Sequence, residues 1–387
     1  MERFSFYNPV RLYFGEGEFG RLGEAVAALG RRALIVTGRR AMREAGWLDQ
    51  AVELLKAARV DPVVFDRVTA NPSDGIVEEG AALAREARCD VVVGLGGGSS
   101  MDTAKAVAVR ATHDEPIAHF VSAGPWGEKR VPGPQTLPVV CATSTAGTSS
   151  ELTRFAVVTV EATKKKAAVV GNAIYPRVAI DDPRLTYSAP RSVTAETGID
   201  VLCHAVEAFL SRVAQPVTDA CAQRAMALVA EWLPRAVVNG QDPEARRQML
   251  LANVFAGYPL SQIGGTLVHA LEHPISALHP EIPHGRGLAV LLPEYLEAMA
   301  EVLPEKTAVV AQVLTGEADA TAADAAPAVR HLLQRVGLSV RLSDIGVSEQ
   351  ELTAVVEGAL DYMAVAIERT PGDWDAGALK RLLQNTV

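Results

Sequence analysis

The chain has 387 residues, of which 49% are hydrophobic and 21% charged, a composition that fits a globular protein of two or three domains. This composition excludes a disordered, collagenous or coiled-coil chain. The 37 basic and 46 acidic residues give a net charge of −9, which argues against non-specific binding to nucleic acid or to an anionic membrane.

No targeting or disulfide pattern is found along the chain. The opening residues MERFSFYNPVRL lack the basic and apolar regions of a secretory signal, and no run of about 18 apolar residues could span a bilayer. The four cysteines form no CxxC pair and suit a reducing cytosol. We therefore expect a cytoplasmic protein with buried thiols and without a membrane partner.

The opening segment has an apolar period of two. The recurring residues are Phe4, Phe6, Val10, Leu12 and Phe14. This period predicts an extended strand. A strand at a terminus can pair with its own sheet or with a second copy of the chain, so we expect a homodimer or a higher homo-oligomer.

Strands and helices alternate through the first half of the chain. Short apolar runs predict strands at residues 33–37, 62–66, 90–94 and 137–141. Helical patterns lie between them, such as residues 48–59 and 74–88. The alternation predicts a parallel sheet with crossover helices, and the continuous apolar runs predict a sheet covered on both faces.

Strand signals stop after Pro183. Residues 190–387 are rich in Ala, Leu, Glu and Arg at helical spacing, with residues 218–238 as a clear example. Prolines and glycines punctuate these helices, and we expect one helix to break at Pro274. The sequence therefore predicts an α/β domain over residues 1–183 and an all-helical domain over residues 184–387.

A glycine-rich turn follows the predicted strand at 90–94. Gly96, Gly97 and Gly98 lead into a helix that we expect to begin near Met101, after a cap at Ser99 or Ser100. Glycines let backbone N–H groups approach a ligand, and a helix start offers unpaired N–H groups with partial positive charge. The turn therefore suits a pyrophosphate. A plain tight turn is the alternative, because the spacing matches neither the usual dinucleotide fingerprint nor a P-loop.

Two further polar segments follow strand ends. Residues 143–151 carry hydroxyl groups that could donate to a phosphate or a carboxamide, and ligands of open α/β sheets bind at such ends. The strand at 33–37 ends in Gly38-Arg39-Arg40, where many dinucleotide enzymes carry an acid that repels a 2′-phosphate. Since arginine pairs well with phosphate, this end favours NADP, with two solvent-facing arginines as the alternative.

Five of the eight histidines lie between residues 204 and 284. Asp200 is four residues before His204, and His269 is four before His273, so each pair shares a helix face. His284 follows a proline-bearing loop that can return it to that face. One carboxylate with three imidazoles suits Fe²⁺ or Zn²⁺ better than Ca²⁺ or Mg²⁺. Spacing alone leaves open which four bind among Asp200, His204, His269, His273, His279 and His284.

Together these segments resemble the iron-containing (group III) alcohol dehydrogenase family. The matching motifs are residues 96–105, 145–151, 197–207, 269–274 and 283–285. They occur in the family's order and spacing, and the resemblance spans roughly residues 30–295. They are specific for the family and much less so for the substrate.

The resemblance implies a Rossmann-like parallel-sheet domain followed by a helical domain, the dehydroquinate synthase-like architecture. It implies a metal ion, Fe²⁺ or Zn²⁺, on Asp200, His204, His269 and His284. It leaves His273 beside that ion as a candidate proton relay. The alternative for His273 is a histidine that only supports the site.

The resemblance also implies a nicotinamide cofactor, NADP or NAD. The residues assigned to it are Gly38, Arg39, Asn71, Gly97, Gly98, Ser99, Asp102, Ser144, Thr148 and Lys166. Gly38 stands where NAD-preferring members carry an acid, and Thr143 and Ser149 replace a proline and a glycine. Residues 259–262 also depart from the family's run, so the resemblance does not carry over a substrate.

We therefore expect a metal-dependent NAD(P)-linked alcohol dehydrogenase or aldehyde reductase that acts on a small molecule. A divalent cation stabilises an alkoxide, and a nicotinamide carries the hydride. Glycerol dehydrogenase and maleylacetate reductase chemistry remain alternatives. A non-redox dehydroquinate synthase-like lyase is disfavoured because no lysine lies between Lys166 and Lys306 to bind an anionic substrate. A non-catalytic binding protein is the third hypothesis, and the intact ligand set argues against it.

Overall fold

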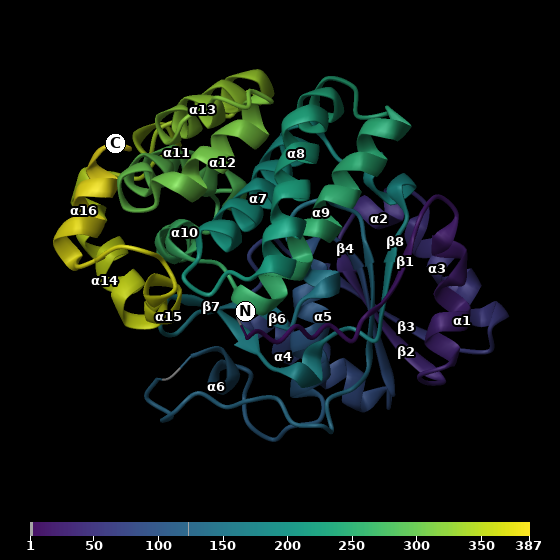
Figure 1. The fold of residues 1–387 in the computed structure, drawn as a ribbon. Helices are drawn as coiled ribbons and strands as arrows, with labels where there is room; N and C mark the ends of the chain where they lie inside the picture. Colours follow the sequence, from purple (N-terminus) through teal and green to yellow (C-terminus); the bar gives the residue numbers. More distant parts are fainter. Residues whose placement is uncertain (1–2, 123) are drawn as a thin grey trace. The chain divides into compact units, whose positions relative to one another are not determined.

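The computed structural model describes residues 3–122 and 124–387, and the chain divides into two compact units. The sheet unit comprises Asn8–Thr145 and Ser149–Ala189. The helical unit comprises Ala146–Thr148, Pro190–Val387 and the described residues up to Tyr7. Figure 1 shows the arrows in the first half of the chain and helices in the green and yellow second half. The expected class, an α/β sheet followed by an all-helical region, is confirmed.

The sheet unit contains eight described strands. They are β1 (Arg11–Phe14), β2 (Arg32–Gly38), β3 (Asp61–Val68), β4 (Val91–Gly96), β5 (Val139–Thr143), β6 (Phe155–Val160), β7 (Lys165–Val170) and β8 (Val178–Asp181). Six of them form a parallel sheet in the order β1-β8-β5-β4-β2-β3, and β6 and β7 form an antiparallel hairpin. The four strands predicted from apolar runs are β2 to β5. In a parallel sheet all their carboxyl ends meet at one edge, which is where the polar turns follow.

Six helices connect the strands. They are α1 (Leu22–Ala27), α2 (Ala41–Glu44), α3 (Trp47–Ala57), α4 (Asp74–Glu86), α5 (Gly98–Arg110) and α6 (Ala118–Val121). Phe19 and residues of α1 and α3 share one core with Ile35 and Val93 on one sheet face. Val92 points to the opposite face and is equally buried, and α5 packs on β4. Both faces are therefore covered, as the continuous apolar runs predicted.

The opening strand is shorter than its sequence period suggests. Only Arg11–Phe14 pairs with β8, in the same chain, and Phe4 and Phe6 lie before the strand with exposed side chains. Pro9 has no N–H to donate to a ladder, which explains why the pairing starts after it. The prediction of a strand from Phe4 onward was therefore wrong for its first half.

The helix after the glycine-rich turn also begins earlier than expected. α5 starts at Gly98 with Gly97 in the N-cap position, and no side chain caps it. Neither Ser99 nor Ser100 is the cap, so that prediction was wrong. Ser99 instead lies in the first turn, where its carbonyl oxygen accepts a hydrogen bond from Thr103 Oγ1 at 2.7 Å. Among the described residues, the N-terminus of α5 therefore has no hydrogen-bonded side-chain cap.

The helical unit contains ten described α-helices. They are α7 (Arg191–Leu210), α8 (Pro216–Val238), α9 (Pro243–Ile263), α10 (Leu267–Leu278), α11 (His284–Val302), α12 (Pro304–Thr315), α13 (Ala325–Val336), α14 (Leu352–Tyr362), α15 (Ala364–Glu368) and α16 (Ala376–Gln384). Their apolar faces enclose one core that extends from α7 to α16. The predicted helix at 218–238 corresponds to α8.

The expected helix break at Pro274 does not occur. α10 runs through Pro274 to Leu278, although proline removes one N–H donor and crowds the preceding turn at a cost of about 3 kcal/mol. Tertiary packing holds the helix together, since Gly358 of α14 leaves room for the ring. A Cβ added there would lie 3.1 Å from Pro274 Cβ. This corrects the sequence-based boundary.

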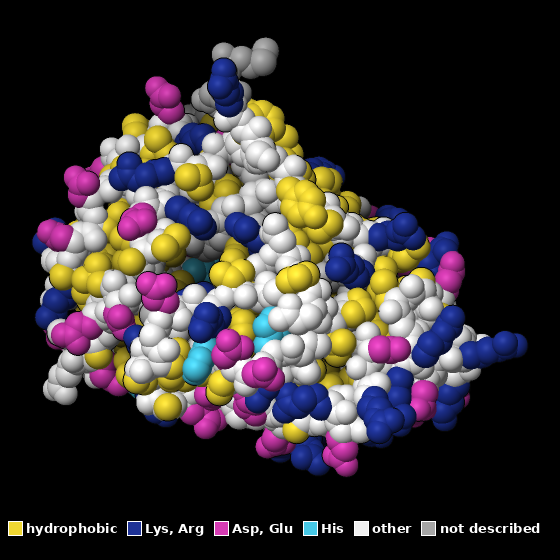
Figure 2. All heavy atoms as spheres, turned by 90° about the horizontal axis from the view of Figure 1, so that it is seen from below, with side chains coloured by type: hydrophobic (Ala, Val, Ile, Leu, Met, Phe, Trp, Pro, Cys, Tyr) yellow, Lys and Arg dark blue, Asp and Glu magenta, His cyan; other side chains and the backbone are white. Residues whose placement is uncertain are grey.

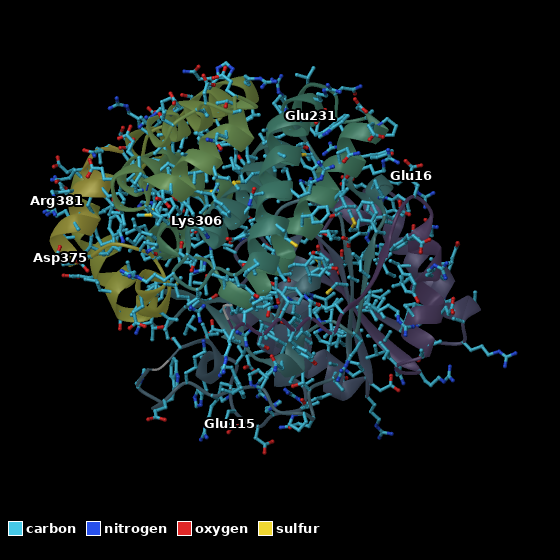
Figure 3. The ribbon with its side chains drawn as sticks, in the orientation of Figure 1. Glu16, Glu115, Glu231, Lys306, Asp375 and Arg381 are labelled. Carbon is cyan, nitrogen blue, oxygen red and sulfur yellow. The ribbon has the colours of Figure 1, made fainter. Side chains whose placement is uncertain are left out.

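Many charged side chains lie on the surface or in ion pairs, whereas Glu151 and Asp181 are fully buried. On the face drawn in Figure 2, basic and acidic groups are interspersed. Of the residues labelled in Figure 3, Asp375 caps α16 by accepting a bond from Ala378 N at 2.8 Å. Lys306 Nζ donates to Phe209 O and to Asp219 Oδ2, both at 2.8 Å.

The cysteines form no disulfide bond among the described residues. All four cysteines are free; Cys89, Cys141 and Cys203 are buried, whereas Cys221 is only half-buried. Across residues 3–122 and 124–387, no helix is both long and apolar enough to cross a membrane.

Candidate functional site

Three helices of the helical unit each carry part of the histidine cluster. α7 presents Asp200 and, one turn later, His204. α10 presents His269 and His273, again one turn apart, and α11 begins at His284. The four-residue spacing places each pair on one helix face, as predicted. All five side chains lie in the same compact unit.

Three imidazole nitrogens converge on one carboxylate oxygen. The Nε2 atoms of His204, His269 and His284 lie 3.3, 3.5 and 3.9 Å from Asp200 Oδ1. Ligands about 2.1 Å from an ion stand roughly 3.4 Å apart at tetrahedral angles. In the part of the chain that the structure describes, the buried Asp200 Oδ1 and His269 Nε2 have no hydrogen-bond partner. The potential ligand atoms of Asp200, His269 and His284 all lie within 4.8 Å of one another, and His204 Nε2 approaches the same Asp200 oxygen. This set of donors suits one Fe²⁺ or Zn²⁺ ion.

The ring arrangement is compact. His204 and His269 stack with centroids 4.6 Å apart and an interplanar angle of 13°. The His273 ring centroid lies 5.7 Å from that of His284 and 6.1 Å from that of His269. His273 is buried beside these rings, and the imidazoles with a close approach to Asp200 are those of His204, His269 and His284.

The sixth sequence candidate lies elsewhere. His279 follows α10 and contacts two carboxylates, Glu351 at 2.9 Å through Nε2 and Glu281 at 3.3 Å through Nδ1. It does not belong to either group of potential metal ligands found among the described residues. The structure thus separates His279 from the other histidines, which spacing alone could not do.

Two buried glutamates contact histidines of this cluster. Glu207 contacts His269 Nδ1, and Glu272 contacts His284 Nδ1. Both carboxylate side chains are fully buried. The sequence interpretation missed both, although Glu207 is three residues after His204 and Glu272 is three after His269. That spacing placed each glutamate on the face of a candidate ligand.

Burial and charge set the protonation of the cluster. Burial lowers the pKa of His204 to about 4, which leaves this imidazole neutral at pH 7. Burial also lowers the pKa of His269, but the negative charges of Glu207 and Asp200, together with the hydrogen bond to Glu207, outweigh it and raise the pKa to about 10. For Asp200, burial raises the pKa, yet the neighbouring histidines hold it well below its usual range. The site therefore keeps an anion at its centre.

The glycine-rich turn of the sheet unit, Gly96 to Gly98, joins β4 to α5 and is called the glycine cradle below. Gly96 has φ 137°, a conformation that favours glycine, and a Cβ there would lie 2.8 Å from Ser100 Oγ. A Cβ on Gly97 would lie 3.3 Å from two atoms of Thr145. Ser144, at the end of the neighbouring strand, donates its N–H to Gly96 O at 3.0 Å. The two polar turns are therefore adjacent.

Asp102 binds the chain itself. Its Oδ1 accepts from Ser150 Oγ at 2.5 Å, and its Oδ2 accepts from Val157 N at 3.0 Å. Lys105 Nζ lies 3.8 Å from the same carboxylate. Asp102 is buried, so its visible role is to attach the second polar turn and β6 to α5.

The other cofactor candidates lie on several different strands and turns. Gly38 ends β2, and Arg39 follows it with an exposed side chain. Asn71 follows β3 with φ 49°, in the left-handed region. Lys166 lies buried on β7. Thr148 falls in the helical unit rather than the sheet unit.

Comparisons with known proteins give a consistent result. Residues 9–183 match the family described as "Iron-containing alcohol dehydrogenase", and residues 194–386 match the "Fe-containing alcohol dehydrogenase family, C-terminal". The chain is 36% identical to the 1,3-propanediol dehydrogenase of Klebsiella pneumoniae, covering 98% of each protein. It is 34% identical to the NAD-dependent methanol dehydrogenase of Bacillus methanolicus, covering 92% of this chain and 93% of that protein.

A solved structure agrees with these matches. The crystal structure of an archaeal halo-thermophilic alcohol dehydrogenase from a Red Sea brine pool superimposes with a TM-score of 0.96. The two chains are 35% identical, and the alignment covers all of both.

Proposed function

Since this chain belongs to the iron-containing alcohol dehydrogenase family, we propose that its converging ligands hold a divalent iron ion for NAD(P)-linked oxidation of a small alcohol, or reduction of the aldehyde. Its activity is that of an alcohol oxidoreductase of this family. The observation that carries the metal assignment is the approach of three Nε2 atoms to Asp200 Oδ1. Zn²⁺ accepts the same ligands and is the alternative ion.

When bound, a divalent cation supplies Lewis-acid chemistry, which lowers the pKa of an alcohol and polarises an aldehyde carbonyl. Asp200 contributes negative charge to hold the ion. His204 is neutral at pH 7, so its Nε2 lone pair is available without loss of a proton. We assign His273 as the group that passes the alcohol proton, because it is buried next to the converging ligands.

The sheet unit is proposed to hold the nicotinamide cofactor. The α5 N-terminus and the backbone of Gly97, Gly98 and Ser99 suit a pyrophosphate. Ser144, Asp102, Lys166 and Asn71 complete the proposed set in this unit, with Asp102 acting through the turn that it anchors. Thr148, which falls in the helical unit, stays a predicted cofactor residue. We assign residues 1–183 to cofactor binding and residues 184–387 to metal and substrate binding.

The end of β2 bears on the choice between NADP and NAD. Among the described residues, neither Arg39 nor Arg40 forms an ion pair, whereas the nearby Arg43 is paired with Asp66 at 2.5 Å. Gly38 places no carboxylate there, and a Cβ at this position would have only one neighbour within 4 Å, Val68 O at 3.8 Å. A 2′-phosphate could therefore pair with Arg39, so we propose that NADP is accepted alongside NAD.

The predicted oligomer and location complete the proposal. β1 forms one edge of the sheet, and Phe4 and Phe6 before it are exposed. An edge strand with exposed apolar neighbours favours pairing with a second copy. We propose a homodimer or higher homo-oligomer in the cytoplasm.

The test is a panel of simple alcohols and aldehydes assayed with NADH, NADPH and their oxidised forms, after metal stripping and reloading with Fe²⁺ or Zn²⁺. We expect turnover that disappears on chelation and returns with the metal. The Arg39→Ala variant should lose about 1.5–3 kcal/mol of NADPH binding, or 10–100-fold in KM, with NADH unaffected. A panel without turnover in either loaded form would refute the proposed activity. Equal losses with both cofactors would refute the role of Arg39.

A further inference from the structure

Glu207 of α7 accepts several hydrogen bonds from residues at the N-terminus of α10. Its Oε1 accepts hydrogen bonds from Thr266 N at 3.0 Å, Thr266 Oγ1 at 3.0 Å, Val268 N at 2.8 Å and His269 N at 3.2 Å. Its Oε2 contacts His269 Nδ1. An oxygen that receives four donors carries no proton, so the glutamate acts as an acceptor toward the ring. His269 Nδ1 must then carry the proton and donate it in the hydrogen bond. In the neutral ring, Nε2 therefore carries the free lone pair.

Glu272 makes a related close contact with the next histidine. Its Oε1 accepts from Ser276 Oγ, one turn along α10, and its Oε2 contacts His284 Nδ1 on α11. Gly287, one turn after His284, leaves room for the glutamate. A Cβ there would lie 2.8 Å from Glu272 Cγ. The packing of α10 against α11 at Gly287 therefore places this carboxylate against Nδ1 of His284.

His204 has no such partner. Among the residues that the structure describes, its Nδ1 accepts or donates no hydrogen bond. Its ring is instead stacked on that of His269. An orientation imposed on His269 by Glu207 therefore also constrains His204.

We propose that Glu207 and Glu272 are positioning residues that orient His269 and His284 and keep Nε2 of each directed at the ion beside Asp200. This rests on the proposed function, because it assumes that these histidines are ligands. A carboxylate on the outer nitrogen fixes the tautomer and makes the imidazole a stronger donor, and its loss typically weakens metal affinity 10–100-fold.

The same reasoning assigns a role to a second cluster. Glu272, His273 and His284 also bring potential ligand atoms within 4.8 Å of one another. Because Glu272 Oε2 contacts His284 Nδ1 directly, we assign this carboxylate to orienting a ligand histidine.

The test compares Glu207→Gln and Glu272→Gln with the parent enzyme. Glutamine keeps the size of the side chain and one acceptor oxygen but removes the charge. Metal affinity is measured by competition between the metal-free protein and a chelator, with Zn²⁺ as the probe. Co²⁺ is then added as a spectroscopic probe, because its visible absorption reports the ligand field. We expect each variant to bind Zn²⁺ about 10–100-fold more weakly and to shift the Co²⁺ bands.

The matched control is Glu294→Gln. Glu294 lies on α11, the helix of His284, and pairs with Arg330 at 2.6 Å without contact to a histidine. We expect this variant to keep the parent affinity and Co²⁺ spectrum. If a glutamine variant fails to fold, Gly287→Ala provides a third variant, since it displaces Glu272 and keeps every ligand and carboxylate.

The outcomes separate this inference from the proposed function. If the parent binds Zn²⁺ and the folded glutamine variants bind it equally well with unchanged Co²⁺ bands, the positioning role is overturned and the metal site stands. If neither Zn²⁺ nor Co²⁺ binds the parent, the proposed metal site is overturned, and the proposed function with it. A lower melting temperature with unchanged affinity would show that the glutamates serve stability alone.

Discussion

Single residues in the metal cluster differ in how readily they release a proton. Burial lowers the pKa of His204 to about 4, whereas Glu207 and Asp200 together overcome burial and raise that of His269 to about 10. In the metal-free protein His269 is therefore protonated at pH 7 and His204 is not. Because a ligand histidine must be neutral, occupation of the site displaces the His269 proton.

This difference predicts a pH-dependent affinity. As pH rises from 6.5 toward 10, proton competition at His269 falls, so apparent metal affinity should rise about tenfold per pH unit. Chelator competition at pH 6.5, 7.5 and 8.5 measures the slope. An affinity that is constant over this range would contradict protonation of His269 in the metal-free state.

At the scale of elements, the site depends on close contact between α7 and α11. Gly285, in the first turn of α11, lies against the backbone of α7, and a Cβ there would stand 2.1 Å from Glu196 O. Neither backbone can yield as a flexible side chain would. This contact sets the position of His284, which is the preceding residue, relative to Asp200.

The corresponding prediction is that Gly285→Ala separates the two helices. Overpacking of this kind costs about 1–3 kcal/mol of unfolding free energy, and movement of His284 should weaken metal binding as well. Urea unfolding and chelator competition measure the two effects. Gly20→Ala is the control, since nothing lies within 4 Å of the added Cβ. Unchanged metal affinity in Gly285→Ala would show that α11 does not position His284.

On the scale of the whole molecule, all four proposed ligands lie in one compact unit, and the glycine cradle lies in the other. Metal binding should therefore stabilise the helical unit directly. At a free metal concentration about 100 times Kd, this stabilisation is about 2.7 kcal/mol. A unit of about 200 residues gains roughly 2–4 °C in Tm per kcal/mol.

We therefore expect metal removal to lower the melting temperature by about 5–10 °C. Scanning calorimetry with and without a chelator provides the measurement. Asp200→Asn, which removes the central anion, should melt at one temperature in both conditions. A parent protein whose melting is unaffected by chelation would contradict metal binding in this unit.

Much of the fold could be predicted from local patterns. Apolar runs located β2 to β5, and their continuity indicated burial on both faces, because a covered parallel strand needs no polar side. Helical spacing located the second half. One error arose where tertiary contacts override local preference, since α10 continues through Pro274 against α14. The other has a local cause, because Pro9 cannot donate to the ladder and the opening strand pairs only after it.

The chemical components of the site can be identified in the sequence: glycines at a strand end, and one aspartate with several histidines at helical spacing. Which of these residues meet depends on how the helices pack. This packing brought His284 to Asp200 across two helices, separated His279, and placed Glu207 and Glu272 on the outer ring nitrogens. The physical reason is that spacing along a helix fixes neighbours within that helix, whereas contacts between helices depend on packing of the whole unit.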